Sequence, residues 1–215
     1  IDEMIEKAVR EQGISCVVNL GAGLDARPYR LDLPPELQWI EVDLPQIIDY
    51  KTPITNEATP RCQIQRRGLD LQRPGALRSF LESLDPQAPT LVLTEGLLLY
   101  LSEAEVISIA QELRRFPQIL TWVTDLNSPR TLKTMKVIWR RLLGKEMEFK
   151  FGVDDSQSFF EPHSWELRDA KPSFLHSSRL GRESQLAPIR KFLVQILGGS
   201  FEKRIRNSAV VVELA

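Results

Sequence analysis

Short apolar runs alternate with segments of helical periodicity along the first 128 residues of the chain. The run at residues 16–20 has the character of a buried strand, and each of the five predicted strands in this region ends at a glycine or an acidic residue. The predicted strands cover residues 16–20, 39–43, 61–67, 90–94, 119–125, 173–176 and 209–214. The predicted helices cover 1–9, 74–84, 102–113, 132–142, 164–170 and 186–197, and a further helix begins at Leu44-Pro45-Gln46. This alternation predicts an α/β fold with an open parallel sheet and helices on both faces.

Residues that favour helix ends support these boundaries. Gly13 is suited to end the first helix, because glycine adopts the left-handed conformation without strain. Ser102 and Glu105 have the spacing of a capping box, and Leu101 and Val106 have that of a hydrophobic staple. The helix after the fourth strand is therefore predicted to begin at Ser102.

Residues 144–163 lack a clear period and mix charges with four phenylalanines: Phe149, Phe151, Phe159 and Phe160. A long connection of this kind inside a compact domain is usually functional or disordered. We expect it to cover the carboxyl ends of the strands and, with Trp165, to line an apolar pocket, although packing in the core explains the aromatic residues equally well. No domain linker or internal repeat interrupts residues 1–215, which predicts a single domain.

A Gly-x-Gly turn closes the first strand. Gly21 and Gly23 would let the backbone approach a ligand, and the next helix would offer its N–H groups and the positive end of its dipole. Asp43 ends the second strand, at the position from which a carboxylate binds ribose hydroxyls. Each feature alone also fits an ordinary turn or strand end, and Asp25-Ala26-Arg27 stands where a dinucleotide fingerprint has its third glycine. Together they favour a ligand that contains adenosine.

Acidic residues stand at the ends of four consecutive strands: Asp43, Asp70, Glu95 and Asp125. In a doubly wound sheet these ends meet at one edge, where ligands bind. So many carboxylates would repel a nucleoside triphosphate, and the sequence has no P-loop lysine. A cationic adenosine ligand suits this edge better.

Composition is ordinary for a globular protein, with 42% hydrophobic and 27% charged residues and a net charge of −1. We find no signal peptide, no apolar run long enough to span a membrane and no nucleic-acid motif. The residues after Asp125 are basic overall, which fits a solvated surface better than an acidic partner. Two cysteines, Cys16 and Cys62, are too few for a disulfide framework or a metal cluster, so we expect both to be core residues. We therefore expect a cytoplasmic protein that holds no metal.

Four blocks of sequence together resemble the S-adenosylmethionine-dependent methyltransferases of the leucine carboxyl methyltransferase type, with polyketide O-methyltransferases as the closer branch. The blocks begin at Asn19, Glu41, Gly68 and Glu95: Asn-Leu-Gly-Ala-Gly-Leu-Asp-Ala-Arg, Glu-Val-Asp-Leu-Pro, Gly-Leu-Asp-Leu and Glu-Gly-Leu-Leu-Leu-Tyr-Leu. The resemblance covers residues 1–128 well and the remainder loosely. It implies a Rossmann-like class I methyltransferase fold, with a seven-stranded, mostly parallel sheet. The last strand would insert antiparallel between strands 119–125 and 173–176.

The resemblance also implies roles for individual residues. Gly21, Ala22 and Gly23 would contact the methionine part of S-adenosylmethionine, with Arg27 holding that loop. Asp43 and Leu44 would lie at the ribose, Asp70 and Leu71 at the adenine, and Glu95 and Gly96 at the cofactor's amino group. Tyr100 would lie near the reaction centre. Asp70 and Tyr100 are also explained as a turn residue and a half-buried wall residue.

Two features depart from the family pattern. Asn19 stands where the family commonly has an acidic residue, and an amide keeps the hydrogen bonds but not the charge. Family members usually carry a helical segment ahead of the position of Ile1, which forms a lid and supplies basic groups for the cofactor's carboxylate. That segment is absent from this sequence, so we expect an open cofactor cleft and an incomplete catalyst.

Methyl transfer from a sulfonium mainly requires that the reactants be positioned and water excluded. A hydroxyl acceptor also needs a base, whereas a carboxylate does not. His163 is the candidate base, although a lone histidine is more often structural.

The favoured function is an O-methyltransferase that acts on a small-molecule hydroxyl or carboxyl group. The alternatives are a carboxyl methyltransferase for a protein C-terminus and a truncated or inactive cofactor-binding module. A nicotinamide dehydrogenase is disfavoured, because the third glycine and a Tyr-x-x-x-Lys pair are missing. The sequence leaves the acceptor and the oligomeric state open.

Overall fold

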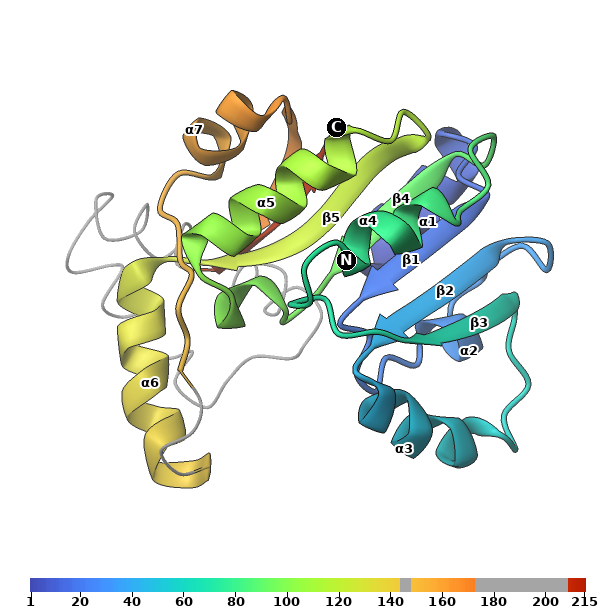
Figure 1. Ribbon diagram of the computed structural model, residues 1–215, viewed down its shortest axis with the longest axis horizontal. Coiled ribbons are helices and arrows are strands. Elements are labelled where there is room, and N and C mark those ends of the chain that lie inside the picture. Colours follow the sequence, from blue (N-terminus) through green and yellow to red (C-terminus); the bar gives the residue numbers. More distant parts are fainter. Residues whose placement is uncertain (144–147, 173–208) are drawn as a thin grey trace, which may run out of the picture.

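The computed structural model describes residues 1–143, 148–172 and 209–215 (Figure 1). The strands in these segments form one seven-stranded sheet in the order β3-β2-β1-β4-β5-β7-β6. They are β1 (Cys16–Leu20), β2 (Gln38–Asp43), β3 (Gln63–Gly68), β4 (Thr90–Thr94), β5 (Ile119–Asn127), β6 (Leu167–Pro172) and β7 (Ala209–Leu214). Strands β1 to β5 pair in parallel, whereas β7 is antiparallel to both β5 and β6. The antiparallel insertion of the last strand next to β5 confirms the predicted topology, although its other neighbour is β6 at residues 167–172 instead of the predicted strand 173–176.

Helices cover both faces of this sheet. They are α1 (Asp2–Glu11), α2 (Arg27–Arg30), α3 (Pro45–Thr55), α4 (Ala76–Glu82), α5 (Glu103–Arg114), α6 (Pro129–Leu143) and α7 (Ser156–Phe160), with short 3-10 helices η1 (Leu98–Tyr100) and η2 (Glu161–His163). One hydrophobic cluster packs α1 on the sheet and includes Met4 and Trp39. The other packs α4 and α5 on the opposite face, with Leu81 and Val106 at its centre. Figure 1 shows α5 lying across the sheet on this second face.

The inner strands explain the continuous apolar runs in the sequence. Every residue of β1 and β4 is buried. Successive side chains point to opposite faces, so Val17 joins the cluster under α1 and Val18 joins the cluster under α4 and α5. Because both faces are covered, both sets of positions are apolar.

The predicted helix ends are confirmed where the chain is described. At the start of α5 the Ser102 hydroxyl accepts from Glu105 N, while the Glu105 carboxylate accepts from Ser102 N at 2.6 Å. Leu101 and Val106 are buried in one cluster, as a hydrophobic staple requires. Gly13 follows α1 with φ of 69°, the left-handed conformation expected of it.

Both cysteines are buried, as expected of core residues. Burial raises the pKa of the Cys16 thiol to about 11 and that of Cys62 to about 11. Neither thiol is therefore primed as a nucleophile.

The predicted helix over residues 164–170 is wrong, because β6 occupies Leu167–Pro172. Glu166 and Ala215 exchange two backbone hydrogen bonds, of 2.8 and 2.9 Å, next to the β6–β7 ladder. Trp165, just before this strand, is buried. Pairing with β7, which is distant in sequence, therefore overrides the local helical pattern.

Residues 148–163 are more regular than the sequence suggested, since they include α7 and η2. Their first part reaches the carboxyl ends of the strands, where Lys150 N donates to Leu99 O at 2.7 Å and Val153 N donates to Asn127 O at 2.9 Å. The later part lies beside α5 (Figure 1). The phenylalanines Phe149, Phe151 and Phe160 are buried. This segment thus contributes to the core as well as to the edge of the sheet.

The predicted strand 173–176 and helix 186–197 lie outside the described residues. None of the helices in the described segments is long and apolar enough to cross a membrane.

Candidate active site

The turn after β1 is fixed by the end of β2. Gly21 N and Ala22 N both donate to Val42 O, at 2.8 and 3.1 Å. Gly21 has φ of 70°, and a Cβ at this position would lie 3.1 Å from Leu97 Cδ1. Glycine is therefore needed both for the turn and for the close approach of the loop that follows β4.

Asp43 is held against this turn by two backbone donors. Gly23 N donates to Asp43 Oδ2 at 2.7 Å, and Leu44 N donates to Asp43 Oδ1 at 2.7 Å. An ionised carboxylate accepts about four hydrogen bonds, so each oxygen keeps a position for a ligand. Gly23 has φ of 45°, and no atom lies within 4 Å of where its Cβ would be, so the turn borders open space.

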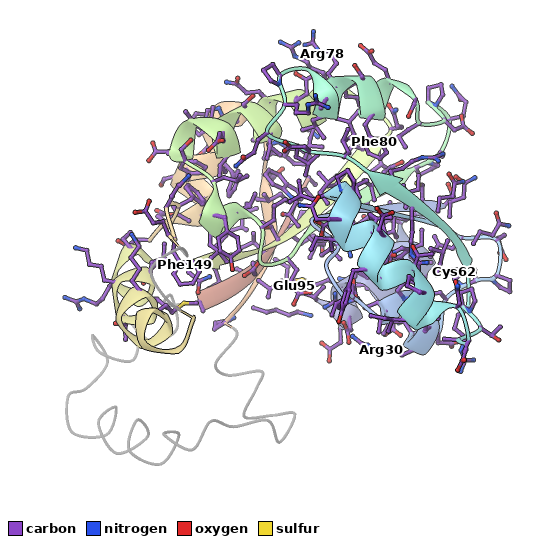
Figure 2. The ribbon with its side chains drawn as sticks, turned by 60° about the horizontal axis from the view of Figure 1, so that its bottom comes forward. Arg30, Cys62, Arg78, Phe80, Glu95 and Phe149 are labelled. Atoms are coloured by element: carbon purple, nitrogen blue, oxygen red, sulfur yellow. The ribbon has the colours of Figure 1, made fainter. Side chains whose placement is uncertain are left out.

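A depression of about 370 Å³ opens beside the glycine turn. It is lined by Asn19, Gly21, Ala22, Gly23, Leu24, Asp25, Ala26, Arg27, Arg30 and Glu95. In Figure 2, Glu95 lies between the labelled side chains of Phe149 and Arg30 at the carboxyl ends of the strands. Three elements, the turn after β1, α2 and the end of β4, thus meet around one space.

Arg27 is the most heavily paired residue of this depression. Its Nη1 lies 2.9 Å from Asp25 Oδ2 and 2.7 Å from Glu95 Oε2, and its Nε lies 2.7 Å from Asp2 Oδ1. Arg27 is only 8% exposed, and its charge is balanced by these three carboxylates. Burial opposes the charged form, but the neighbouring acids outweigh it and raise the pKa of Arg27. Arg27 therefore stays charged and ties α1 to the strand ends.

Arg30 follows one helical turn after Arg27 and is far more accessible. Its Nη1 lies 2.6 Å from Asp2 Oδ2, and half of its side-chain surface is exposed (50%). Burial acts to raise the pKa of Asp2, yet hydrogen bonds from Arg30 and Arg27 lower it to about 2. Arg30 thus offers the depression a cation with open donor positions.

The departure at Asn19 has a local explanation. Asn19 is 2% exposed, and its Nδ2 donates to Asp25 Oδ2 at 2.8 Å. An acidic residue at position 19 would place a second carboxylate against Asp25. Two ionised carboxylates only accept hydrogen bonds, so neither could donate to the other. The amide therefore supports the same turn through a donor.

The loop after β3 approaches Asp43 from the other side. Leu69 N donates to Asp43 O at 2.7 Å, and Gln72 N donates to Asp70 Oδ1 at 3.0 Å. The turn hydrogen bond fixes the carboxylate of Asp70 and leaves its second oxygen open. Leu71 is partly buried against the core, and Leu44 is 37% exposed.

A second group lies at the ends of β4 and β5. Gly96 N donates to Asp125 Oδ1 at 2.6 Å, and Tyr100 packs on Phe149 with ring centroids 5.6 Å apart. Burial raises the pKa of Asp125, and the charge of Glu95 adds to the effect. Burial and the charge of Asp125 likewise raise the pKa of Tyr100. Asp125 Oδ2 has no hydrogen-bond partner in the described parts of the chain.

His163 is placed apart from these groups. Its ring faces Phe159, with centroids 6.0 Å apart, in the segment beside α5. No hydrogen bond, ion pair or ring contact between described residues joins His163 to Glu95, Tyr100 or Asp125. A role as base for His163 stays a prediction.

The structure thus divides the predicted site into two parts. The glycine-turn side comprises Gly21, Ala22, Gly23, Arg27, Arg30, Asp43 and Glu95, with the Asp70 loop next to it. The Tyr100 side comprises Gly96, Tyr100, Asp125 and Phe149.

Sequence reasoning missed Asp2 and Arg30 as members of the glycine-turn side. The spacing of Arg27 and Arg30, three residues apart in a helix, was a signal that both share one face. Asp2 gave no such signal, because only the docking of α1 on the sheet brings it to these arginines.

A sheet in this order, with an antiparallel β7 and a glycine turn after β1, defines the fold of the class I methyltransferases. A protein of the DUF574 family from Streptomyces avermitilis shares this fold, with a TM-score of 0.66, 12% identity, and coverage of 99% of this chain and 79% of that one. Magnesium protoporphyrin IX methyltransferase from Synechocystis PCC 6803, solved with bound S-adenosylhomocysteine, has a TM-score of 0.52 at 9% identity, covering 99% and 80%.

The family model described as Leucine carboxyl methyltransferase matches residues 1–114, and the chain belongs to that family. Two curated relatives carry the name S-adenosyl-L-methionine-dependent methyltransferase. The one from Streptomyces avermitilis is 36% identical over 110 residues, covering 49% of this chain and 38% of the relative. The one from Mycobacterium marinum is 31% identical over 159 residues, covering 72% and 45%. The chain therefore spans less than half the length of these two relatives.

Proposed function

We propose that this protein binds S-adenosylmethionine and transfers its methyl group to a hydroxyl group of a small molecule. The observation that carries the proposal is Asp43, whose carboxylate is fixed by Gly23 N and Leu44 N at 2.7 Å each and still has free acceptor positions. Two adjacent ribose hydroxyls match the spacing of two carboxylate oxygens. The identity of the cofactor is inferred from the family to which the chain belongs.

The remaining residues of the edge fit the other parts of that cofactor. The open oxygen of Asp70 suits the exocyclic amine of adenine, and Leu44 and Leu71 supply apolar surface for the ring. Gly21, Ala22 and Gly23 line the depression through which the thioether chain would pass, and Gly23 borders its open space. When bound, S-adenosylmethionine supplies a methyl group activated by the sulfonium.

The methionine part has two charges, and the depression offers a partner for each. Glu95, with 45% of its side chain exposed, suits the ammonium group, with Gly96 next to it in the loop. Arg30, with 50% of its side chain exposed, suits the carboxylate. Arg27 is the other cation of the lining set and is already bound to three carboxylates. This use of Arg30 gives the carboxylate a charged partner within the described chain.

The Tyr100 side would receive the acceptor. Tyr100 and Phe149 form an aromatic wall, and Gly96 lies where the glycine-turn side and the Tyr100 side meet. Asp125 Oδ2, open and with a raised pKa, is suited to take the proton of an acceptor hydroxyl as its oxygen attacks the methyl carbon. On this proposal Asp125, rather than His163, acts as the base.

The charges of this region favour a neutral acceptor. Glu95 and Asp125 are both acidic, and a carboxylate acceptor would be placed between them at an electrostatic cost. Transfer to a carboxyl group, including that of a protein C-terminus, is the second candidate, and the description of the matched family favours it. The two candidates differ in the chemistry of their product.

The test uses S-adenosylmethionine with a labelled methyl group and a panel of phenols matched to benzoic acids. We expect label in the phenols, in a form that resists mild alkali, because methyl ethers are stable where methyl esters hydrolyse. Asp125→Asn should lower the transfer rate at least tenfold without weakening S-adenosylhomocysteine binding, an effect typical of a general base. Alkali-labile label would favour the carboxyl acceptor, and no transfer to any acceptor would contradict the proposed activity.

A further inference from the structure

The orientation of Glu95 is set by a buried arginine rather than by its own loop. Glu95 has 45% of its side-chain surface exposed, a situation in which a carboxylate normally samples several rotamers. Here its Oε2 lies 2.7 Å from Arg27 Nη1, whose side chain is 9% exposed. In this ion pair, Glu95 lies where a side chain is normally free to move, whereas Arg27 is fixed by burial.

Arg27 is itself held by two elements that are remote from β4. Asp25 accepts from Arg27 N at 2.9 Å and from Nη1 at 2.9 Å, which anchors the arginine to the turn after β1. Asp2 accepts from Nε at 2.7 Å, which anchors it to α1. The planar guanidinium has a rigid set of donors, so the contacts of Nε with Asp2 and of Nη1 with Asp25 also fix the direction in which Nη1 faces Glu95.

This arrangement leaves one oxygen of Glu95 for a ligand. Oε2 is used by Arg27, while Oε1 has no hydrogen-bond partner in the described parts of the chain. Glu95 lines the same depression as Gly21 and Gly23. A cationic donor in that depression would meet an acceptor whose position has already been fixed, and it would not need to order the side chain.

We propose that Arg27 is a positioning residue that holds Glu95 for the ammonium group of the methionine moiety. The proposal rests on the proposed function, since it concerns the same cofactor site. It assigns the two arginines of α2 different tasks, with Arg27 acting through Glu95 on the ammonium and Arg30 acting directly on the carboxylate.

A positioning role and a purely electrostatic role of Arg27 predict changes of opposite sign in ligand affinity when Arg27 is replaced. Arg27 is a cation near the site of a cationic group, so its charge alone disfavours an ammonium ligand. If charge were the whole effect, Arg27→Met would strengthen binding of a ligand that carries the ammonium without the carboxylate. If Arg27 positions Glu95, the same change weakens it, because Glu95 loses its fixed rotamer.

The experiment compares three ligands by calorimetry. S-adenosylhomocysteine carries both the ammonium and the carboxylate, its decarboxylated analogue carries only the ammonium, and 5′-methylthioadenosine carries neither. Arg27→Met should weaken the first two ligands roughly tenfold to a hundredfold and change the third less than about threefold. Arg30→Met is the matched control, and it should weaken S-adenosylhomocysteine alone.

Removal of Arg27 leaves three acidic residues near one another, so the variant needs a check by circular dichroism. If Arg27→Met does not fold, Arg27→Lys decides, since it keeps the charge but not the rigid donor geometry. It should weaken the same two ligands and spare 5′-methylthioadenosine.

Unchanged or tighter binding of the decarboxylated analogue in a folded Arg27 variant would overturn the positioning role. Equal weakening of all three ligands would also overturn it, because that result indicates general damage to the site. If wild-type protein binds none of the three, the proposed function fails as well. Binding to wild type with no effect of Arg27 would defeat this inference alone.

Discussion

The two sides of the carboxyl-end edge are built in different ways. On the glycine-turn side, charged groups are paired before any ligand arrives, as Asp43 is by two backbone donors and Arg27 by three carboxylates. On the Tyr100 side, one aromatic contact and one carboxylate with an open oxygen define the surface. The first side offers many fixed polar positions, whereas the second offers an aromatic wall with a single carboxylate.

This difference matches the demands of the two reactants in the proposed function. The cofactor is the same in every reaction cycle, so it binds best to a site with many fixed hydrogen-bonding groups. Each such group adds affinity without a rearrangement of its side chain. An acceptor site needs shape and one group that handles a proton. The two sides should therefore respond separately to substitution.

Phe149→Ala should have the largest effect on stability. Phe149 is 3% exposed, and its truncation should lower the free energy of unfolding by about 3 kcal/mol. S-adenosylhomocysteine affinity of the folded protein should change less than about twofold, since the glycine-turn side is untouched. Phe160→Ala, at a buried position in α7 that packs on Trp122, is the matched control for stability. Chemical denaturation and calorimetry give the two quantities, and a large loss of cofactor affinity in Phe149→Ala would show that the sides are coupled.

A pair of glycine variants tests the glycine-turn side from within. Gly21→Ala should lower the free energy of unfolding by about 1–2 kcal/mol, because φ is 70° and the new Cβ meets Leu97 at 3.1 Å. Gly23→Ala should cost about 1 kcal/mol or less, since it has φ of 45° and no atom within 4 Å. The Cβ of Gly23→Ala would point into the open space of the depression. This variant should therefore lose more free energy of S-adenosylhomocysteine binding than free energy of unfolding. The reverse ranking in thermal unfolding would contradict the packing described for Gly21.

The smallest effect concerns the pH dependence of stability through Asp2. Its pKa is lowered from an ordinary 3.8 to about 2, so its contribution is present above 3.8 and is lost as the pH falls through 2. Because 38% of the Asp2 side chain is exposed, we expect less than about 1 kcal/mol. Asp2→Asn should lower stability near neutral pH and converge with wild type near pH 2. Asp49→Asn, at an exposed position on α3, is the control, and a constant difference for Asp2→Asn across this range would rule out the ion pairs as its cause.

The sequence predicts the first five strands well for a physical reason. The inner strands β1 and β4 are buried parallel strands, and their apolar runs follow directly from burial on both faces. The edge strand β3 lacks such a run, because its residues are exposed or half-buried. The predicted helix at residues 164–170 was wrong because β6 is specified by pairing with β7, which is more than thirty residues further along the chain. Pairings of that kind leave little trace in a local pattern.

The site shows the same limit. Gly21, Gly23 and Asp43 carry their own signals, in turn chemistry and in spacing. The structure joins Gly23 to Asp43 through one hydrogen bond and Gly21 to the neighbouring Val42 through another. Asp2 enters the site only because α1 packs on the sheet beside α2. Sequence reasoning placed Asp125 at the same edge but did not predict that it accepts a hydrogen bond from Gly96 N, since that contact depends on the pairing of β4 with β5.

The most direct test of the account is calorimetric titration of S-adenosylhomocysteine into wild-type protein and Asp43→Ala. We expect wild type to bind, NAD not to compete, and Asp43→Ala to bind about 1.5–3 kcal/mol more weakly, because charge-assisted hydrogen bonds to the ribose are lost. Asp49→Asn should bind as wild type does. Equal affinity of wild type and Asp43→Ala for S-adenosylhomocysteine would contradict the assignment of the glycine-turn side as the cofactor site.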